Sequence, residues 1–161
     1  MEAKAMDKNQ IKTLFVKRLT DEEQKYQAIA DKAREDAISG EAKQEAKYDT
    51  RAIEASYLAG SLARRKEEIT LARQEIENLE TREQSQVGVG ALVEIEENED
   101  IQCFYMTESV GGYEISYGDQ TIRTLSLTSG LGRSLVEASA GEDLEFQTPK
   151  GVREISVISV Y

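Results

Sequence analysis

The chain has 161 residues, with 20 Lys and Arg against 31 Asp and Glu, no histidine and a single cysteine, Cys103. Without histidine, Ser-His-Asp catalysis, Cys-His catalysis and histidine-ligated metal sites are excluded, and one cysteine excludes an intrachain disulfide framework or a Cys-x-x-Cys zinc ribbon. The length predicts one ordinary domain or two small ones.

The negative charge is concentrated in the second half of the chain. Residues 1–86 carry 16 basic and 18 acidic side chains, whereas residues 87–161 carry 4 and 13, a net charge of −9. Such a segment repels phosphate backbones, so we expect contact with nucleic acid only indirectly. The polar first residues are unlike a signal peptide, and the apolar runs are far shorter than the roughly 20 residues of a membrane helix. We therefore expect an acidic cytoplasmic protein with no membrane partner.

The first half has the composition of helices, because it lacks proline and is rich in Ala, Glu, Lys, Arg and Gln. The later part of this half contains a heptad seam, in which the apolar residues follow one another at intervals that alternate between three and four residues. Its apolar members are Ala55, Leu58, Leu62, Ile69, Ala72, Ile76 and Leu79. Arg65 interrupts this seam, and we expect it to snorkel or to pair with an acid of another helix.

A looser apolar stripe precedes that seam, and the best break signal between the two is Ser39-Gly40. The stripe consists of Ile11, Phe15, Leu19, Tyr26, Ile29, Ala33 and Ala37. Two helices joined by a short turn fold back on each other. The sequence therefore predicts an antiparallel coiled-coil hairpin over residues 1–86, with its tip near 38–46. An unbroken helix in a parallel dimer is the alternative.

After Gln86 the pattern changes to short alternating segments separated by turn residues. Strands are expected at 91–96, 101–106, 113–117, 121–127, 144–148 and 152–160, and a short helix at 131–138. Pro149-Lys150-Gly151 has the chemistry of a turn. Residues 87–161 are therefore predicted to form an α+β domain, a small antiparallel sheet packed on one short helix. Within it, Cys103 is expected to be a core or edge residue of a strand.

Four stretches of this second domain resemble the Gre family of bacterial transcription elongation factors. They are Ser129-Gly130-Leu131-Gly132-Arg133-Ser134-Leu135-Val136, the turn Gly141-Glu142-Asp143, the turn Pro149-Lys150-Gly151 and the ending Ile155-Ser156-Val157-Ile158-Ser159-Val160-Tyr161. The resemblance covers about residues 87–161 and implies an FKBP-like fold there. The first half is similar to the family in architecture.

The resemblance implies a function that depends on RNA polymerase. The hairpin of a Gre factor enters the secondary channel of the polymerase, where two acids at its tip help to hold a second Mg²⁺, and the polymerase then cleaves the RNA of a backtracked complex. The chain itself would then be no enzyme and would have no cofactor and no stably bound metal, since the Mg²⁺ belongs to the polymerase active centre. A monomer that binds RNA polymerase is expected.

The resemblance also assigns candidate residues at two places. The family tip, Gly-Asp-Leu-x-Glu-Asn-Ala-Glu-Tyr, stands here as Gly40-Glu41-Ala42-Lys43-Gln44-Glu45-Ala46-Lys47-Tyr48. Glu41 takes the place of the aspartate, while Gln44 occupies the second acidic position and Glu45 follows it, so Glu41 and Glu45 are the candidate tip acids. In the second domain the candidates for docking on the polymerase are Ser129, Gly130, which replaces the proline of the family, and Leu131.

Two alternatives to cleavage stimulation are open at this point. A secondary-channel factor that binds without promoting cleavage is compatible with Gln44. A different class, a structural adaptor whose helices form a coiled-coil dimer, is compatible with the heptad seam.

Overall fold

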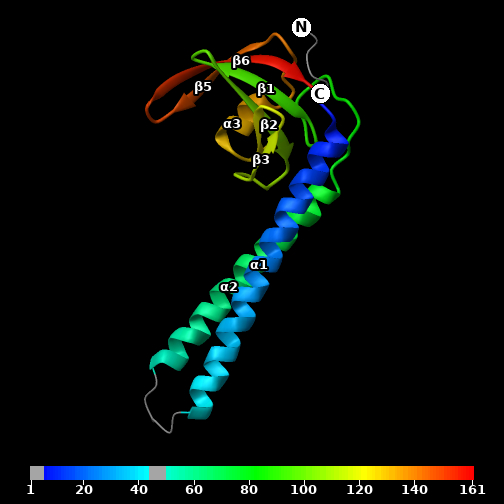
Figure 1. Ribbon diagram of the computed structural model, residues 1–161. Helices are drawn as coiled ribbons and strands as arrows, with labels where there is room; N and C mark the ends of the chain where they lie inside the picture. Colours follow the sequence, from blue (N-terminus) through cyan, green and yellow to red (C-terminus); the bar gives the residue numbers. More distant parts are fainter. Residues whose placement is uncertain (1–5, 44–49) are drawn as a thin grey trace. The chain divides into compact units, whose positions relative to one another are not determined.

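The structure is a computed structural model, and it describes residues 6–43 and 50–161. Two long helices, α1 (Lys8–Lys43) and α2 (Thr50–Glu77), precede a six-stranded sheet with one short helix (Figure 1). The chain divides into two compact units, one formed by the residues up to Val16 together with those from Glu75 onward, the other by Lys17–Gln74. Across the described residues, no helix is both long and apolar enough to span a membrane.

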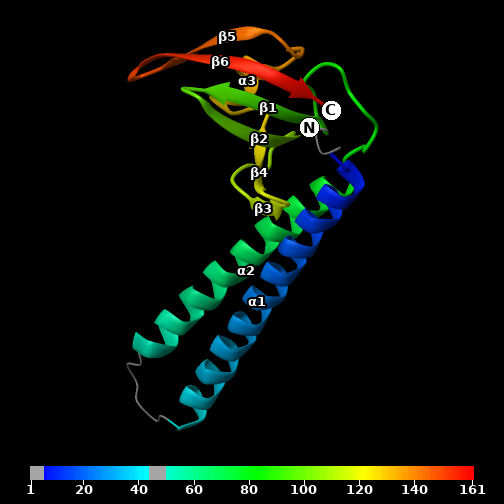
Figure 2. The same ribbon diagram turned by 45° about the horizontal axis from the view of Figure 1, so that its top comes forward.

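The unit Lys17–Gln74 is an antiparallel pair of helices, as the apolar stripes predict (Figures 1 and 2). Contacts between the arms run in opposite directions along the chain, since Glu23 contacts Thr70 and the later Gln27 contacts the earlier Lys66. Leu19 and Ile69 are completely buried, and Ala72 is 6% exposed. The hairpin expected from the sequence is therefore confirmed.

The hairpin departs from the sequence prediction in two respects. Helix α1 continues through Ser39 and Gly40 to Lys43, so the predicted break lies within the helix. One glycine costs a helix only about 1 kcal/mol, and the good helix formers around Gly40 tolerate it. The predicted apolar pattern also fails at two positions, because Ile29 of the looser stripe is 41% exposed and Leu58 of the heptad seam is 53% exposed, whereas Ala30 is buried.

In the other unit, the strands form one sheet in the order β3-β4-β2-β1-β6-β5. The strands are β1 (Leu92–Glu97), β2 (Asp100–Thr107), β3 (Glu114–Tyr117), β4 (Gln120–Ser126), β5 (Asp143–Thr148) and β6 (Gly151–Val160), and the short helix is α3 (Gly130–Leu135). The expected α+β class and the expected strands are confirmed.

The sheet is not purely antiparallel as predicted, because β2 and β4 pair in parallel. The chain leaves β2, forms β3 at the edge of the sheet and returns as β4 between them, antiparallel to β3. Turn residues in a sequence indicate which neighbours form hairpins, and they do not indicate where a hairpin inserts. The predicted orientation was therefore wrong for this one pair.

Different segments of the chain pack on the two faces of the sheet. On the α3 face the core is apolar, with Phe104, Met106, Leu135, Ile155 and Val157 all buried. The same face carries a bidentate ion pair, in which Arg153 donates to Glu97 at 2.7 and 2.5 Å.

The first turns of α1 meet the sheet within the same unit. Phe15 stacks on Tyr105 of β2 with ring centroids 5.7 Å apart. Both residues are completely buried, and so is Ile11. The helical hairpin thus begins from a packed base formed by its own first and last turns and the sheet.

Candidate functional site

The predicted tip acids fall at the limit of what the structure describes. Glu41 belongs to the last turn of α1, which ends at Lys43, but its side chain lies outside the described residues. Gln44 and Glu45 lie outside them entirely. Within the described part of the chain no group of three or more acidic or cysteine side chains is arranged to hold a metal ion. The role of Glu41 and Glu45 therefore stays a prediction.

A layer of polar side chains crosses the middle of the hairpin. Arg73 of α2 donates to the carboxylate of Glu23 on α1 at 2.9 Å, and Thr70 donates to the same carboxylate at 2.9 Å. One turn further along, Lys66 donates to the side chain of Gln27. The guanidinium of Arg73 is the main cause that lowers the pKa of Glu23 below its ordinary value of 4.5.

Arg65 belongs to this layer, which explains why it stands in an otherwise apolar seam. Its guanidinium lies 3.9 Å from Glu22 of the other arm and 3.0 Å from Glu68 of its own helix. The expected pairing with an acid of the opposite arm is confirmed. Paired charges at such positions fix which residues of two helices lie opposite each other. The layer thus favours, together with the buried apolar residues, the register in which α1 and α2 run.

The predicted docking serine caps helix α3. The Ser129 hydroxyl accepts from the Gly132 amide at 3.0 Å and donates to the Ser126 carbonyl at 2.7 Å. Both bonds are intramolecular, and a serine in this position satisfies an amide that the first turn of a helix leaves unpaired. Ser129 therefore shapes the loop, and its hydroxyl is engaged within the chain.

The other two docking candidates differ in what they expose. Gly130 is exposed, and a Cβ there would lie 3.2 Å from the ring of Phe146. Leu131 is half-buried against the apolar core. The exposed side chains at this place are instead those of Arg133, on α3, and of Val136, the C-cap residue that follows it. Val136 is 42% exposed. The sequence signal for them is their position on the opposite side of the helix from buried Leu135.

Gly132 was not singled out from the sequence, yet it is the most constrained position of this loop. A Cβ at Gly132 would lie 2.0 Å from the carbonyl oxygen of Ser126 and 2.9 Å from Leu127 Cα, both backbone atoms. Real Cβ atoms do not approach backbone this closely, so helix α3 can lie against the end of β4 only because residue 132 has no side chain.

Three polar side chains that the sequence did not reveal hold the base of the hairpin, two of them to the sheet domain and one between its two arms. The Lys8 ammonium donates to the carbonyls of Arg82 at 2.7 Å and Tyr161 at 3.0 Å, and burial lowers its pKa. Lys12 donates to the Leu79 carbonyl at 2.8 Å, just after α2 ends. Glu75 accepts from the backbone amide of Ser109 at 3.1 Å. A lysine near a polar chain start gives no signal of burial, which explains the omission.

Residues 82–161 match the family model described as "Transcription elongation factor, GreA/GreB, C-term". Transcription elongation factor GreA of Syntrophobacter fumaroxidans is 36% identical over 73 residues, which is 45% of this chain and 43% of that protein. The GreA protein of Syntrophus aciditrophicus is 29% identical over 123 residues, 76% of this chain and 72% of that one.

A solved structure, GreA factor homolog 1 (Gfh1) of Thermus thermophilus, aligns with 91% of this chain and 94% of its own, at 17% identity and a TM-score of 0.36. Together with the fold, the two sequence matches define a protein built as a helical hairpin followed by a Gre-type C-terminal domain. Residues 82–161 of the chain form a C-terminal domain of the GreA/GreB family of transcription elongation factors.

Proposed function

We propose that this chain binds bacterial RNA polymerase, inserts its helical hairpin into the secondary channel and rescues backtracked complexes by stimulating cleavage of the transcript. The observation that carries the proposal is the combination in one chain of the GreA/GreB C-terminal domain at residues 82–161 with an antiparallel hairpin formed by α1 and α2. Catalysis belongs to the polymerase, whose Mg²⁺ the tip helps to hold. The chain acts in the cytoplasm, where its partner is found.

Charge supports the division of labour between the two parts of the chain. The hairpin half has a net charge of −2 and the other half one of −9. A strongly negative domain is repelled by RNA and DNA, so it contacts protein surfaces, while the nearly neutral hairpin approaches the transcript.

In this proposal the tip supplies Glu41 as the first acid and Glu45 as the second. Mg²⁺ takes about six oxygen ligands and is usually held by only one or two protein carboxylates, so two acids at the end of a rigid arm suffice. Ser129, Gly130 and Leu131 shape the loop that docks on the polymerase surface, and Arg133 and Val136 are the exposed side chains beside it.

The test is transcript cleavage in a stalled, backtracked elongation complex of a bacterial RNA polymerase with Mg²⁺. We expect the protein to accelerate removal of the RNA 3′ end and Glu41→Ala to abolish the acceleration, whereas Glu35→Ala, an exposed acid of the same helix, leaves it unchanged. Acceleration that persists in Glu41→Ala would contradict the assignment of the tip.

Gln44 favours the second candidate function, a secondary-channel factor that does not promote cleavage. That candidate predicts no acceleration, together with competition against a known cleavage factor for the polymerase. Absence of both effects would contradict binding in the secondary channel and favour the coiled-coil adaptor, which predicts a dimer in solution where the proposed function predicts a monomer.

A further inference from the structure

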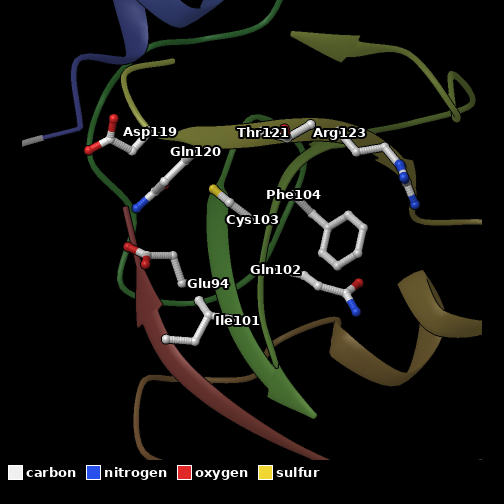
Figure 3. Close-up of a pocket in the computed structure, with 9 residues that line it drawn as sticks. All are labelled: Glu94, Ile101, Gln102, Cys103, Phe104, Asp119, Gln120, Thr121 and Arg123. Atoms are coloured by element: carbon white, nitrogen blue, oxygen red, sulfur yellow. The ribbon is translucent and has the colours of Figure 1, made fainter. Parts of the chain in front are cut away.

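A cleft of about 560 Å³ opens in the sheet where β2 and β4 begin (Figure 3). The parallel ladder between these strands starts only at Cys103 and Ile122. Before it, Ile101 and Gln102 of β2 pair with β1, and Gln120 and Thr121 of β4 pair with β3. The two strands therefore diverge at their starts, and the edges that face each other across the cleft do not share a ladder.

One wall of the cleft is acidic. Glu94 and Asp119 line it together with Gln120 and the sulfur of Cys103, and Figure 3 shows Glu94, Cys103 and Gln120 turned to the same side of β2. Neither carboxylate forms an ion pair with a cation of the described part of the chain. Two hydroxyls of the C-terminal residues bond to Glu94: Ser159 donates a long hydrogen bond to it at 3.4 Å, and the phenol of Tyr161 also hydrogen-bonds to it.

The cation that lines the cleft, Arg123, does not neutralise this wall. Arg123 also lines the cleft, but it points to the other side of β2 (Figure 3). Its guanidinium is paired with Glu114 of the neighbouring strand, with a contact of 2.8 Å. The acidic wall thus presents two carboxylates, a primary amide and a thiol, with the hydroxyls of Ser159 and Tyr161 beside Glu94.

Cys103 gives an observation that is independent of the acids. Its side chain is 5% exposed and turns its sulfur toward the cleft. Burial and the charge of Glu94 raise the pKa of the thiol to about 12. The thiol therefore stays protonated and forms an uncharged, weakly polar part of the cleft surface. Beside it Ile101 is 62% exposed, an apolar side chain at the mouth.

We propose that this cleft binds an arginine side chain of a partner protein. The guanidinium is planar and carries five N–H donors, which matches two carboxylates and an amide oxygen on the wall of a slot. Ile101 and the thiol contact the methylene groups of the same side chain. A volume of about 560 Å³ exceeds what one amine fills, which favours an arginine within a peptide segment over a small free cation. The site is separate from the residues of the proposed polymerase function, so either proposal can fail without the other.

The experiment is a titration of the full chain, labelled with ¹⁵N, with N-acetyl-arginine amide followed by two-dimensional NMR. We expect saturable shifts at millimolar concentrations in the amides of Ile101, Gln102, Gln120 and Thr121. N-acetyl-citrulline amide, which has the same shape without the charge, and N-acetyl-lysine amide are the comparison probes. Binding that is at least tenfold tighter for arginine supports the proposal, and equal shifts from all three probes would overturn it.

A pair of double variants identifies the wall. Glu94→Gln with Asp119→Asn should weaken arginine binding at least tenfold. The matched control, Glu145→Gln with Glu154→Gln, also removes two carboxylates from the sheet, at directly opposed positions of β5 and β6, and should leave binding unchanged. Should the first double variant not fold, Asp119→Asn alone, at an exposed position, tests the same point. Binding that is equal in the two double variants contradicts the site.

Discussion

At the scale of single residues, Gly132 shows how one missing side chain positions the α3 loop. Because a Cβ there would overlap the Ser126 carbonyl, Gly132→Ala must push helix α3 away from β4. We expect a loss of about 2–4 kcal/mol in the free energy of unfolding of the sheet domain. Urea unfolding followed by circular dichroism measures it.

Gly60→Ala is the matched control, because nothing lies within 4 Å of a Cβ there and the residue is within helix α2. Replacing a helical glycine by alanine stabilises by about 1 kcal/mol. A Gly132→Ala protein as stable as the wild type would contradict the close approach of α3 to the sheet.

Glu23 makes the stability of the hairpin depend on pH. Its pKa in the folded chain is lowered, chiefly by the hydrogen bond from Arg73, relative to an ordinary value of 4.5. The stabilisation from this carboxylate is therefore present above the ordinary value and is lost as the pH falls through the folded value.

Thermal unfolding of the wild type and of Glu23→Gln should accordingly differ at neutral pH and converge as the solution is acidified below about pH 4. The control is Glu67→Gln, an exposed acid of α2. If the difference between wild type and Glu23→Gln stayed constant with pH, the pairing with Arg73 would have no part in stability.

At the scale of elements, the strongest sequence predictions were those that rest on a regular period. The strands of the second domain agree with the predicted segments to within one or two residues, since alternation and turn residues both mark them. The heptad seam holds from Ile69 to Leu79, where both arms contribute apolar side chains. The seam fails at Leu58 and the looser stripe of the first helix fails at Ile29, because a period indicates which face of a helix is apolar without indicating where the partner helix lies.

Ile69 and Leu71 of α2 test which face of that helix packs against α1. Ile69 is completely buried, and Leu71, two residues on, is 59% exposed. Ile69→Ala should destabilise by about 2–5 kcal/mol, while Leu71→Ala should change stability by less than about 0.5 kcal/mol. Denaturant unfolding of the two variants gives the comparison, and similar losses in both would mean that the helices pair through another face.

The candidate sites were predicted less completely than the fold. The sequence located Ser129 correctly in the loop before α3, but only the structure shows that its hydroxyl caps the helix and that Gly132 is the constrained position. Glu41 and Glu45 depend on an alignment of a few tip residues. The parallel pairing of β2 with β4 is a contact between strands distant in sequence, and so the cleft between them could not be predicted from local pattern.

At the scale of the whole molecule, the chain joins a helical hairpin to a GreA/GreB C-terminal domain, and in the proposed function the hairpin enters the polymerase channel. A thiol-directed label can be placed near the tip of the hairpin, at Ile38. Ile38 is 61% exposed on α1. The native Cys103 is 5% exposed with a pKa raised to about 12, so it does not compete for thiol-directed labels.

The most direct measurement is photo-crosslinking from Ile38→Cys, labelled with a maleimide benzophenone and bound to a bacterial RNA polymerase elongation complex. The same label at Ile158→Cys on β6 is the control, since Ile158 is exposed on the sheet domain. We expect crosslinks from position 38 to polymerase segments that line the secondary channel beside the active centre, and none there from position 158. Crosslinks from position 38 confined to the outer surface of the polymerase, or none at all, would contradict insertion of the hairpin.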